Sequence, residues 1–315
     1  MNKRERFYAA IRGAPIDRAP VVAWCNLATD GVDATENARR QLAFHRLGDW
    51  DILKVMNDYR LASPPGLDTI SSAADLLAFK RRPMTERGFF EQLETLRILR
   101  REVGPEVPIL DTLLEPFFSA CFTVGFSTAS LIRSHPIEAA SMLDAITATF
   151  VDYIGELKRI GVDGVLYATN GCIIGNAARA ITDDEYRAFH RPYDLRLLEA
   201  MQGLVRIVHA HGNPLAIERV LDYPCEALSW SDRLAGNPSI AAMRQRTTKC
   251  VMGGIDESKL FERGLPEVRA EIADALAQSG GPRNFILSPG CNINPGTATR
   301  TLRAVTEAAR SSIAG

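Results

Sequence analysis

Three side chains of the kinds that bind zinc lie at the predicted ends of two strands: His209, His211 and Cys291. A β-branched run leads into the two histidines, and the Gly-Asn-Pro directly after His211 ends the strand. Side chains at positions i and i+2 of a strand point to the same face, so the two imidazoles can converge on one ion. A second apolar run, 284–288, ends in Pro-Gly and presents Cys291. Two imidazoles and one thiolate predict a catalytic zinc site with an open fourth position.

The same three residues also have an ordinary interpretation. Paired histidines on a strand occur as hydrogen-bonded packing residues, and a lone cysteine is commonly a small buried hydrophobe. Because the residues are far apart in sequence, only a fold that brings the two strand ends together can make them a metal site.

Other polar and aromatic residues also follow predicted strands. Asp58 comes after the strand 51–56 and is the candidate catalytic carboxylate, for substrate orientation or proton transfer; its alternative role is a helix N-cap. Four further residues are candidate substrate contacts, with core packing as the alternative for the tryptophans: Trp24, Asn170, Trp230 and Asp256.

The remaining histidines and one arginine have structural interpretations. His45, His135 and His190 fall on or beside predicted helices, so we expect solvated or helix-terminal positions for them. Arg18 follows a turn on the N-terminal side of the predicted sheet, where we expect it to form a structural ion pair.

The elements that must position these residues alternate between strand and helix. A helical lead-in is predicted at 4–13, and the longest predicted helix is 136–160. Eight apolar runs are predicted strands: 20–25, 51–56, 108–114, 164–169, 205–211, 226–230, 250–256 and 284–288. This alternation implies parallel strands, and eight units predict an α/β fold, a single (β/α)8 TIM barrel domain over residues 1–315 with an N-terminal helical lead-in. In such a barrel the carboxyl ends of all strands open into one bowl.

Charge and composition narrow the classes of partner. The net charge is −1 and no sustained basic run is present, so we expect no nucleic-acid partner and no membrane partner. No apolar run approaches the roughly 20 residues of a membrane span, and the first residues lack a signal-peptide core, which predicts a soluble, cytoplasmic protein. The six cysteines lack CxxC spacing, which argues against a disulfide framework. The expected partner is a small-molecule substrate, and a homodimer is one arrangement compatible with the sequence.

Five stretches carry a family resemblance: the opening 4–20, Gly-Val-Asp-Gly at 161–164, His-Ala-His-Gly at 209–212, Gly-Gly-Ile-Asp at 253–256, and Leu-Ser-Pro-Gly-Cys at 287–291. Together they resemble the uroporphyrinogen decarboxylase superfamily (UroD-like). The resemblance implies a (β/α)8 barrel, in agreement with the strand count.

The resemblance also implies two kinds of chemistry. The decarboxylases carry an aspartate at the position of Asp58, but they also have an arginine cluster after the first strand and a histidine in the last strand loop. Here no arginine follows Trp24 before Arg39, and the last loop carries Cys291. The methyl-transferring branch binds zinc through His-x-Cys and a Ser-Pro-Gly-Cys loop, which this chain resembles except at His211.

A metal-dependent reaction is therefore the leading functional expectation. The resemblance implies zinc-dependent methyl transfer or demethylation, linked to a thiol or to a corrinoid carried by a partner protein. A metal-free decarboxylase of a porphyrinogen-like or other small carboxylic acid, using Asp58, is the first alternative. A non-catalytic barrel that binds a corrinoid partner is the second. Replacing a thiolate by His211 makes the site more positive and the metal a stronger Lewis acid.

Overall fold

A curved, fully parallel sheet forms the centre of the molecule. The computed structural model describes residues 1–29, 31–59, 61–126, 128–175 and 179–311. Its seven strands follow one another in chain order across the sheet: β1 (Leu53–Lys54), β2 (Ile109–Leu114), β3 (Gly164–Thr169), β4 (Val205–Ala210), β5 (Ala227–Trp230), β6 (Cys250–Ile255) and β7 (Phe285–Pro289). Every neighbouring pair is parallel, which confirms the predicted α/β class.

The first of the eight predicted strands, 20–25, is not a regular strand in the structure. In the described part of the chain, the segment 20–25 forms no regular strand and makes a single parallel bridge, between Val21 and Leu287 of β7. Its backbone nevertheless bonds to both edges of the sheet: Val22 N–H donates to Leu287 O at 3.1 Å, and Asp51 N–H donates to Val21 O at 2.8 Å. Pro20 has no N–H to donate, which limits regular pairing at the start of the segment.

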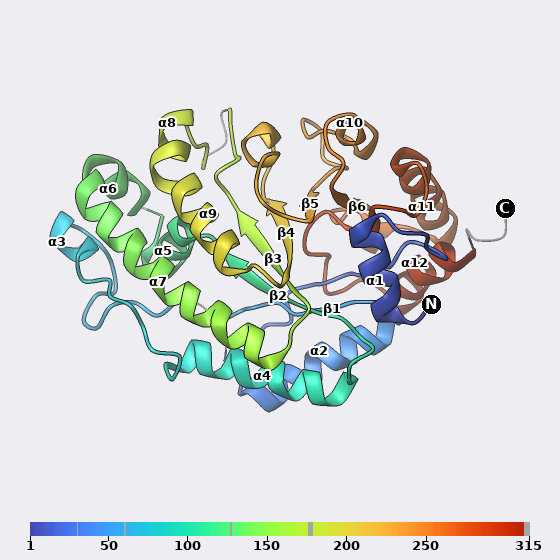
Figure 1. Cartoon of the computed structure of the whole chain (residues 1–315), viewed down its shortest axis with the longest axis horizontal. Coiled ribbons are helices and arrows are strands. Elements are labelled where there is room, and N and C mark those ends of the chain that lie inside the picture. The colour runs from blue at the N-terminus through green and yellow to red at the C-terminus, as the bar shows by residue number, and fades with distance from the viewer. Residues whose placement is uncertain (30, 60, 127, 176–178, 312–315) are drawn as a thin grey trace.

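Helices surround the sheet (Figure 1). The longer ones are α1 (Lys3–Arg12), α2 (Ala34–Gly48), α4 (Arg87–Val103), α5 (Pro116–Val124), α7 (Pro136–Ile160), α9 (Arg191–Ala200), α11 (Leu265–Ser279) and α12 (Thr299–Ser311). Shorter ones are α3 (Ala73–Leu76), α6 (Thr128–Ser134), α8 (Asp183–Glu185) and α10 (Ile240–Arg244), with the π-helical turn η1 (Tyr186–His190) and the 3₁₀ turns η2 (Ile217–Val220) and η3 (Leu260–Glu262).

Several crossovers are short or irregular. The segment after β4 contains the single 3₁₀ turn η2, and the π-helical turn η1 lies directly before α9. The longest helix, α7, has its predicted bounds, because Pro136 occupies its first turn and Gly161 ends it in the left-handed conformation.

Alternation along the strands separates an inner from an outer layer. In β4, Val205 and Ile207 belong to a cluster inside the curved sheet, whereas Val208 and Ala210 pack outward against the helices. Phe7 and Ala10 of α1 join the inner cluster, so this helix covers the interior at the amino ends of the strands. The carboxyl ends are left for the polar residues.

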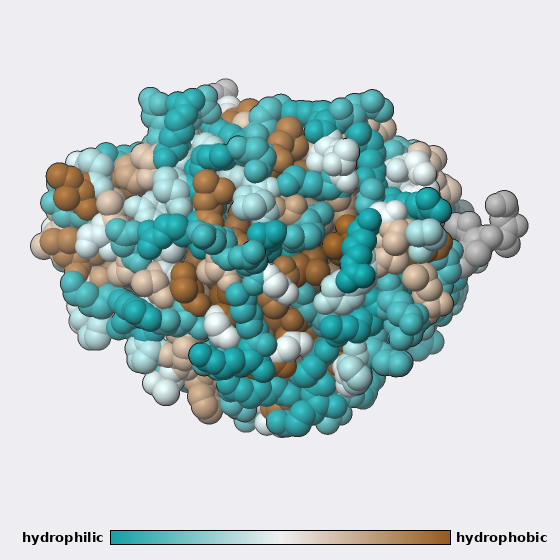
Figure 2. All heavy atoms as spheres, viewed as in Figure 1, coloured by the Kyte–Doolittle hydropathy of each residue, from teal (hydrophilic) through white to brown (hydrophobic). Residues whose placement is uncertain are grey.

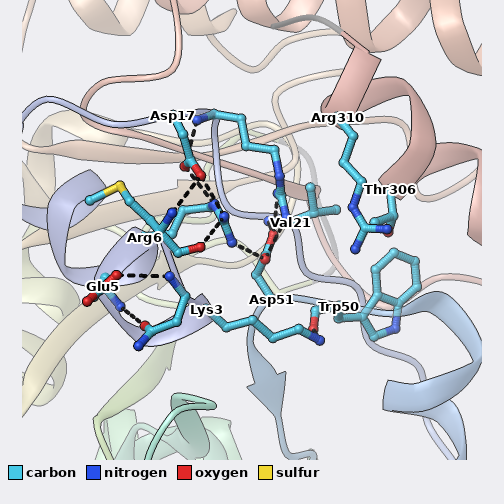
Figure 3. A network of polar contacts seen from close by, with 12 residues as sticks. Lys3, Glu5, Arg6, Asp17, Val21, Trp50, Asp51, Thr306 and Arg310 are labelled. Atoms are coloured by element: carbon cyan, nitrogen blue, oxygen red, sulfur yellow. Dashed lines mark hydrogen bonds and ion pairs between the residues drawn. The ribbon is translucent and has the colours of Figure 1, made fainter.

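A network of ion pairs ties α1 to the amino ends of the strands. Figure 3 shows Arg6 between Asp17 and Asp51, with distances of 2.7 and 2.8 Å. Arg18 donates two further hydrogen bonds to Asp51, at 2.5 and 2.8 Å, which confirms its predicted structural ion pair. Val21 N–H donates to the same carboxylate at 2.9 Å, so the network also anchors the segment 20–25.

Two features of the surface and helices bear on partners. Figure 2 shows hydrophilic residues over much of the visible face, with apolar side chains in separate patches between them. Among the described helices, none is both long and apolar enough to cross a membrane.

Candidate metal centre

Strand pairing places His209 and His211 on the inner side of the sheet at its carboxyl end. His209 is in register with Ala168 of β3 and Ser229 of β5. His211 continues the strand geometry, because its N–H donates to Thr169 O at 2.9 Å. The two imidazoles therefore face the same side, two residues apart.

The loop after β7 brings Cys291 to this pair. His209 Nε2 lies 3.4 Å from His211 Nδ1, and Cys291 Sγ lies 3.6 Å from the same His211 Nδ1. One ligand atom of each side chain lies within 4.8 Å of the others. The structure thus brings Cys291 to His211, from which it is separated by 80 positions of sequence.

Two of the three separations between ligand atoms, those that involve His211 Nδ1, suit a tetrahedrally coordinated ion. With zinc–nitrogen distances of about 2.0–2.1 Å and a zinc–sulfur distance of about 2.3 Å, tetrahedral geometry separates two nitrogens by about 3.3 Å and nitrogen from sulfur by about 3.6 Å. The spacing of His211 from its two neighbours is close to both values. Two imidazoles and a thiolate are also the donor types that zinc prefers.

Electrostatics favours the protonation states that bind a metal. Burial lowers the pKa of His209, and burial together with the charge of Arg179 lowers the pKa of His211. Burial opposes ionisation of Cys291, but its contact with His209 outweighs this and brings the pKa of the thiol below its ordinary value. Burial thus favours the neutral imidazoles that a metal needs, and a positive charge beside Cys291 favours the thiolate.

Ser229 supports the orientation of His209. Its Oγ lies 3.3 Å from His209 Nδ1. A partner on Nδ1 fixes the ring so that Nε2 faces the other two ligands, as outer-shell partners commonly do for metal-binding histidines.

Asp58 lies at the end of the extended stretch after β1 and is half-buried. Its Oδ2 accepts hydrogen bonds from the backbone N–H and the hydroxyl of Thr29, at 3.2 and 2.7 Å. Among the described residues it therefore caps the loop after the segment 20–25 rather than a helix, and its charge influences the pKa of Lys54 and Cys25.

The structure places Trp24 and Trp230 in different layers. Trp24 belongs to the inner cluster, and its backbone oxygen accepts a hydrogen bond from Ile293 N–H, at 3.0 Å, in the loop that carries Cys291. Trp230 is fully buried in the outer layer and donates from Nε1 to Pro238 O at 2.7 Å. Trp24 thus contacts the loop that carries Cys291 through its backbone, and Trp230 packs on the outer side of the sheet.

Asn170 and Asp256 also differ. The N–H of Asn170 donates to Glu115 at 2.7 Å, while its buried Oδ1 has no partner among the described residues. Asp256 accepts from the N–H and hydroxyl of Ser258 at 3.0 and 2.5 Å and lies 3.6 Å from Arg263. Asn170 therefore has free hydrogen-bonding capacity, whereas Asp256 is engaged in the turn after β6.

Two buried charged residues near the centre were not predicted. Glu257 accepts from Ser231 at 2.5 Å, its other oxygen is buried without a partner in the described parts of the chain, and its charge influences the pKa values of His211 and Cys291. Lys54 is 4% exposed, and burial lowers its pKa to about 7, although Cys291 and Asp111 nearby favour the charged form. The sequence could have indicated Lys54, because it lies at an inward-facing position of an otherwise apolar predicted strand.

Two histidines expected to be solvated or helix-terminal are buried. His45 is 5% exposed on α2, and His190 is 1% exposed at the end of η1. His190 Nδ1 lies 2.7 Å from Glu115 Oε2, and its ring lies 4.5 Å from that of Phe117. Both histidines lie at helix ends, as predicted, but neither is solvated, because tertiary packing covers their faces. His135 is the N-cap residue of α7.

Seven parallel strands that bring two imidazoles and a thiol together at their carboxyl ends define a barrel-like α/β protein with a candidate metal centre. The chain belongs to the family "Uroporphyrinogen decarboxylase (URO-D)", whose sequence profile matches residues 58–312. This establishes the predicted family.

The relatives include two kinds of enzyme. The chain is 23% identical to the Methylcobamide:CoM methyltransferase MtbA of Methanosarcina acetivorans, over 98% of this chain and 97% of that protein. It is also 23% identical to a Uroporphyrinogen decarboxylase of Geotalea daltonii, over 68% of this chain and 63% of that protein. Among solved structures, a methyltransferase from Methanosarcina mazei has a TM-score of 0.79 at 20% identity and full coverage of both chains, which shows a shared fold.

Proposed function

We propose that this chain is a zinc-dependent methyltransferase or demethylase, with His209, His211 and Cys291 as the metal ligands. The observation that carries the proposal is the convergence of these three side chains within 4.8 Å of one another. Full-length similarity to a methylcobamide:CoM methyltransferase supports the same reaction class. We treat the fold as one (β/α)8 barrel domain, supported by the hydrogen bonds of the segment 20–25 to both edges of the sheet.

The ligand set has chemical consequences. A zinc ion bound here would act as a Lewis acid and favour deprotonation of a thiol or hydroxyl group in its fourth position. One thiolate and two neutral imidazoles leave this site one unit more positive than a His-Cys-Cys set, which favours oxygen-bearing substrates as well as thiols. Methyl transfer forms a bond from that sulfur or oxygen to the methyl carbon as the bond to the donor breaks, or runs in the opposite direction. A corrinoid carried by a partner protein is the proposed donor or acceptor.

Other residues that follow the strands would position the substrate. Asn170 offers an amide oxygen without a partner in the described residues, Trp24 an aromatic ring on the inner side of the sheet, and Asp58 a carboxylate. Trp230 and Asp256 have local partners, so their predicted substrate contacts have less support than that of Asn170.

The metal content of protein purified without chelator tests the proposal. We expect about one zinc per chain by elemental analysis, with Cys291→Ser losing zinc to a chelator more readily than either histidine-to-alanine variant, because it removes the only anionic ligand. Cys225→Ser is the matched control, since Cys225 is buried in the outer layer. Absence of stoichiometric zinc in zinc-saturated wild type, or its full retention in Cys291→Ser, would overturn the proposal and favour metal-free decarboxylation.

A further inference from the structure

Lys54 is a buried cation inside the sheet without a matching anion. Its Nζ contacts Met56 Sδ at 2.6 Å and lies 4.8 Å from the ring centre of Trp24. No carboxylate forms an ion pair with it within the described ranges of the chain. An ammonium group has three donors and a thioether is only a weak acceptor, so most of its hydrogen-bonding capacity is unused. Lysine is almost never buried unless it is paired.

The two carboxylates whose charges act on Lys54, Asp111 and Asp58, form their hydrogen bonds with other residues. Asp111 faces the outer layer, where Gln92 and Tyr153 donate to its two oxygens at 2.8 and 2.7 Å. Asp58 receives both hydrogen bonds of Thr29. Both carboxylates influence the charge of Lys54 at a distance, but neither supplies an acceptor to it.

Lys54 borders the candidate metal centre. Ile52 belongs to the inner cluster and Leu53 to the outer layer, so alternation turns Lys54 inward. Trp24, against which Lys54 lies, is hydrogen-bonded through its backbone oxygen to Ile293, two residues after Cys291. Trp24 thus contacts the ammonium group through its ring and the Cys291 loop through its backbone, and the charge of Cys291 acts on Lys54.

We propose that Lys54 binds a single anionic group, a carboxylate or a sulfonate, on the small substrate whose thiol or hydroxyl meets the metal. The incoming anion supplies the acceptors that the ammonium lacks and displaces its contact with Met56. One lysine matches one negative charge, so the site selects monoanionic substrates over neutral ones and over polycarboxylates. Lys54 is therefore a specificity-determining residue. The part of this proposal that places the thiol or hydroxyl group of the substrate at the metal rests on the proposed function. The contact between Lys54 and the anionic group needs no metal.

The first experiment compares a charged and a neutral thiol of similar shape. Calorimetry on the zinc-loaded full chain measures binding of 3-mercaptopropionate and of 3-mercaptopropionamide. We expect the wild type to bind the anion about ten- to a hundredfold more tightly, since a hydrogen bond to a charged group contributes in that range. Lys54→Met should lose this preference with binding of the amide unchanged, and Lys54→Arg should retain part of it. Equal binding of the two thiols by the wild type, or equal loss of both in Lys54→Met, overturns the proposal.

A second experiment separates the anion contact from the metal. Metal-free protein is titrated with propionate and with ethanesulfonate while the tryptophan fluorescence is followed, to which Trp24 beside Lys54 contributes. The anion that binds more tightly identifies the anion class. A change that saturates in the wild type and is absent in Lys54→Met supports the proposal even if no zinc binds, in which case only the proposed function fails. No saturable change in the wild type with either anion overturns it. Lys54→Met should unfold at the same or a higher denaturant concentration, because it removes an unpaired buried charge.

Discussion

Charged side chains are buried at both ends of the sheet, but they are paired at the amino ends of the strands and largely unpaired at the carboxyl ends. At the amino ends, Asp51 is fully buried and accepts from both Arg6 and Arg18. At the carboxyl ends, Lys54 has only the weak acceptor Met56 Sδ, and one oxygen of Glu257 is buried without a hydrogen-bond partner in the described residues. Burying a polar group without a hydrogen-bond partner costs folding free energy, so such groups at the carboxyl ends indicate a ligand site. The fully paired charges at the amino ends indicate a role in stability.

The largest expected effect is loss of stability at the amino ends. Asp51→Asn leaves the buried guanidinium group of Arg18 without its counter-charge and Arg6 with Asp17 alone, and breaking a buried pair costs about 3–5 kcal/mol. Urea denaturation measures the free energy of unfolding. The control is Asp49→Asn, whose 54% exposed side chain pairs with Lys3 and Arg310 and should cost no more than about 1 kcal/mol. Equal losses in the two variants would contradict the comparison.

The second prediction concerns acid sensitivity at the same end. Burial lowers the pKa of His45 to about 4. Between pH 6.5 and 4, His45 is therefore protonated in the unfolded chain but neutral in the folded chain. Stability contributed by neutral His45 is therefore lost as pH falls through this window, by about 2–3 kcal/mol near pH 4.5. His45→Gln, in metal-free protein, should lose correspondingly less stability between pH 7 and 4.5. Identical pH dependence in the two proteins would disprove this assignment.

The third prediction tests Asp58 at the carboxyl ends. Asp58→Asn keeps an oxygen that can accept from Thr29, so stability should change by less than about 1 kcal/mol. If the carboxylate orients substrate or transfers a proton, the turnover number for methyl transfer should fall about ten- to a hundredfold. Steady-state kinetics with methylcobalamin and a thiol acceptor, together with urea denaturation, give both quantities. A loss of about 1 kcal/mol in stability with unchanged turnover would make Asp58 a loop cap only.

The smallest expected effect is on the zinc affinity of the candidate metal centre. Ser229→Ala removes the group near His209 Nδ1, and loss of such an outer partner lowers metal affinity about tenfold or more. Competition with a fluorescent zinc chelator measures the affinity. Ser288→Ala is the control, because the Ser288 hydroxyl donates to the neighbouring Pro289 O and contacts no ligand. Equal affinity of the two variants would remove Ser229 from the site.

Much of the fold could be predicted because buried parallel strands are continuous apolar runs. The strands β2 to β7 lie where such runs were found, and α7 has its predicted bounds. The segment 20–25 was predicted as a strand from the same kind of run, but the structure pairs it only around Val21. The helices α5 and α6 were not predicted. The π-helical turn η1 depends on packing around His190, for which a local pattern has no signature.

Residue types and local spacing by themselves determined the elements that are periodic and the common orientation of His209 and His211, because side-chain alternation is a property of two adjacent peptide units. The approach of Cys291, the burial of His45 and His190, and the outward position of Trp230 were decided only by the tertiary structure. The same holds for the isolation of Lys54 from both nearby carboxylates. These features depend on which distant segments pack together, and that choice is made by the whole core rather than by any one stretch of the chain.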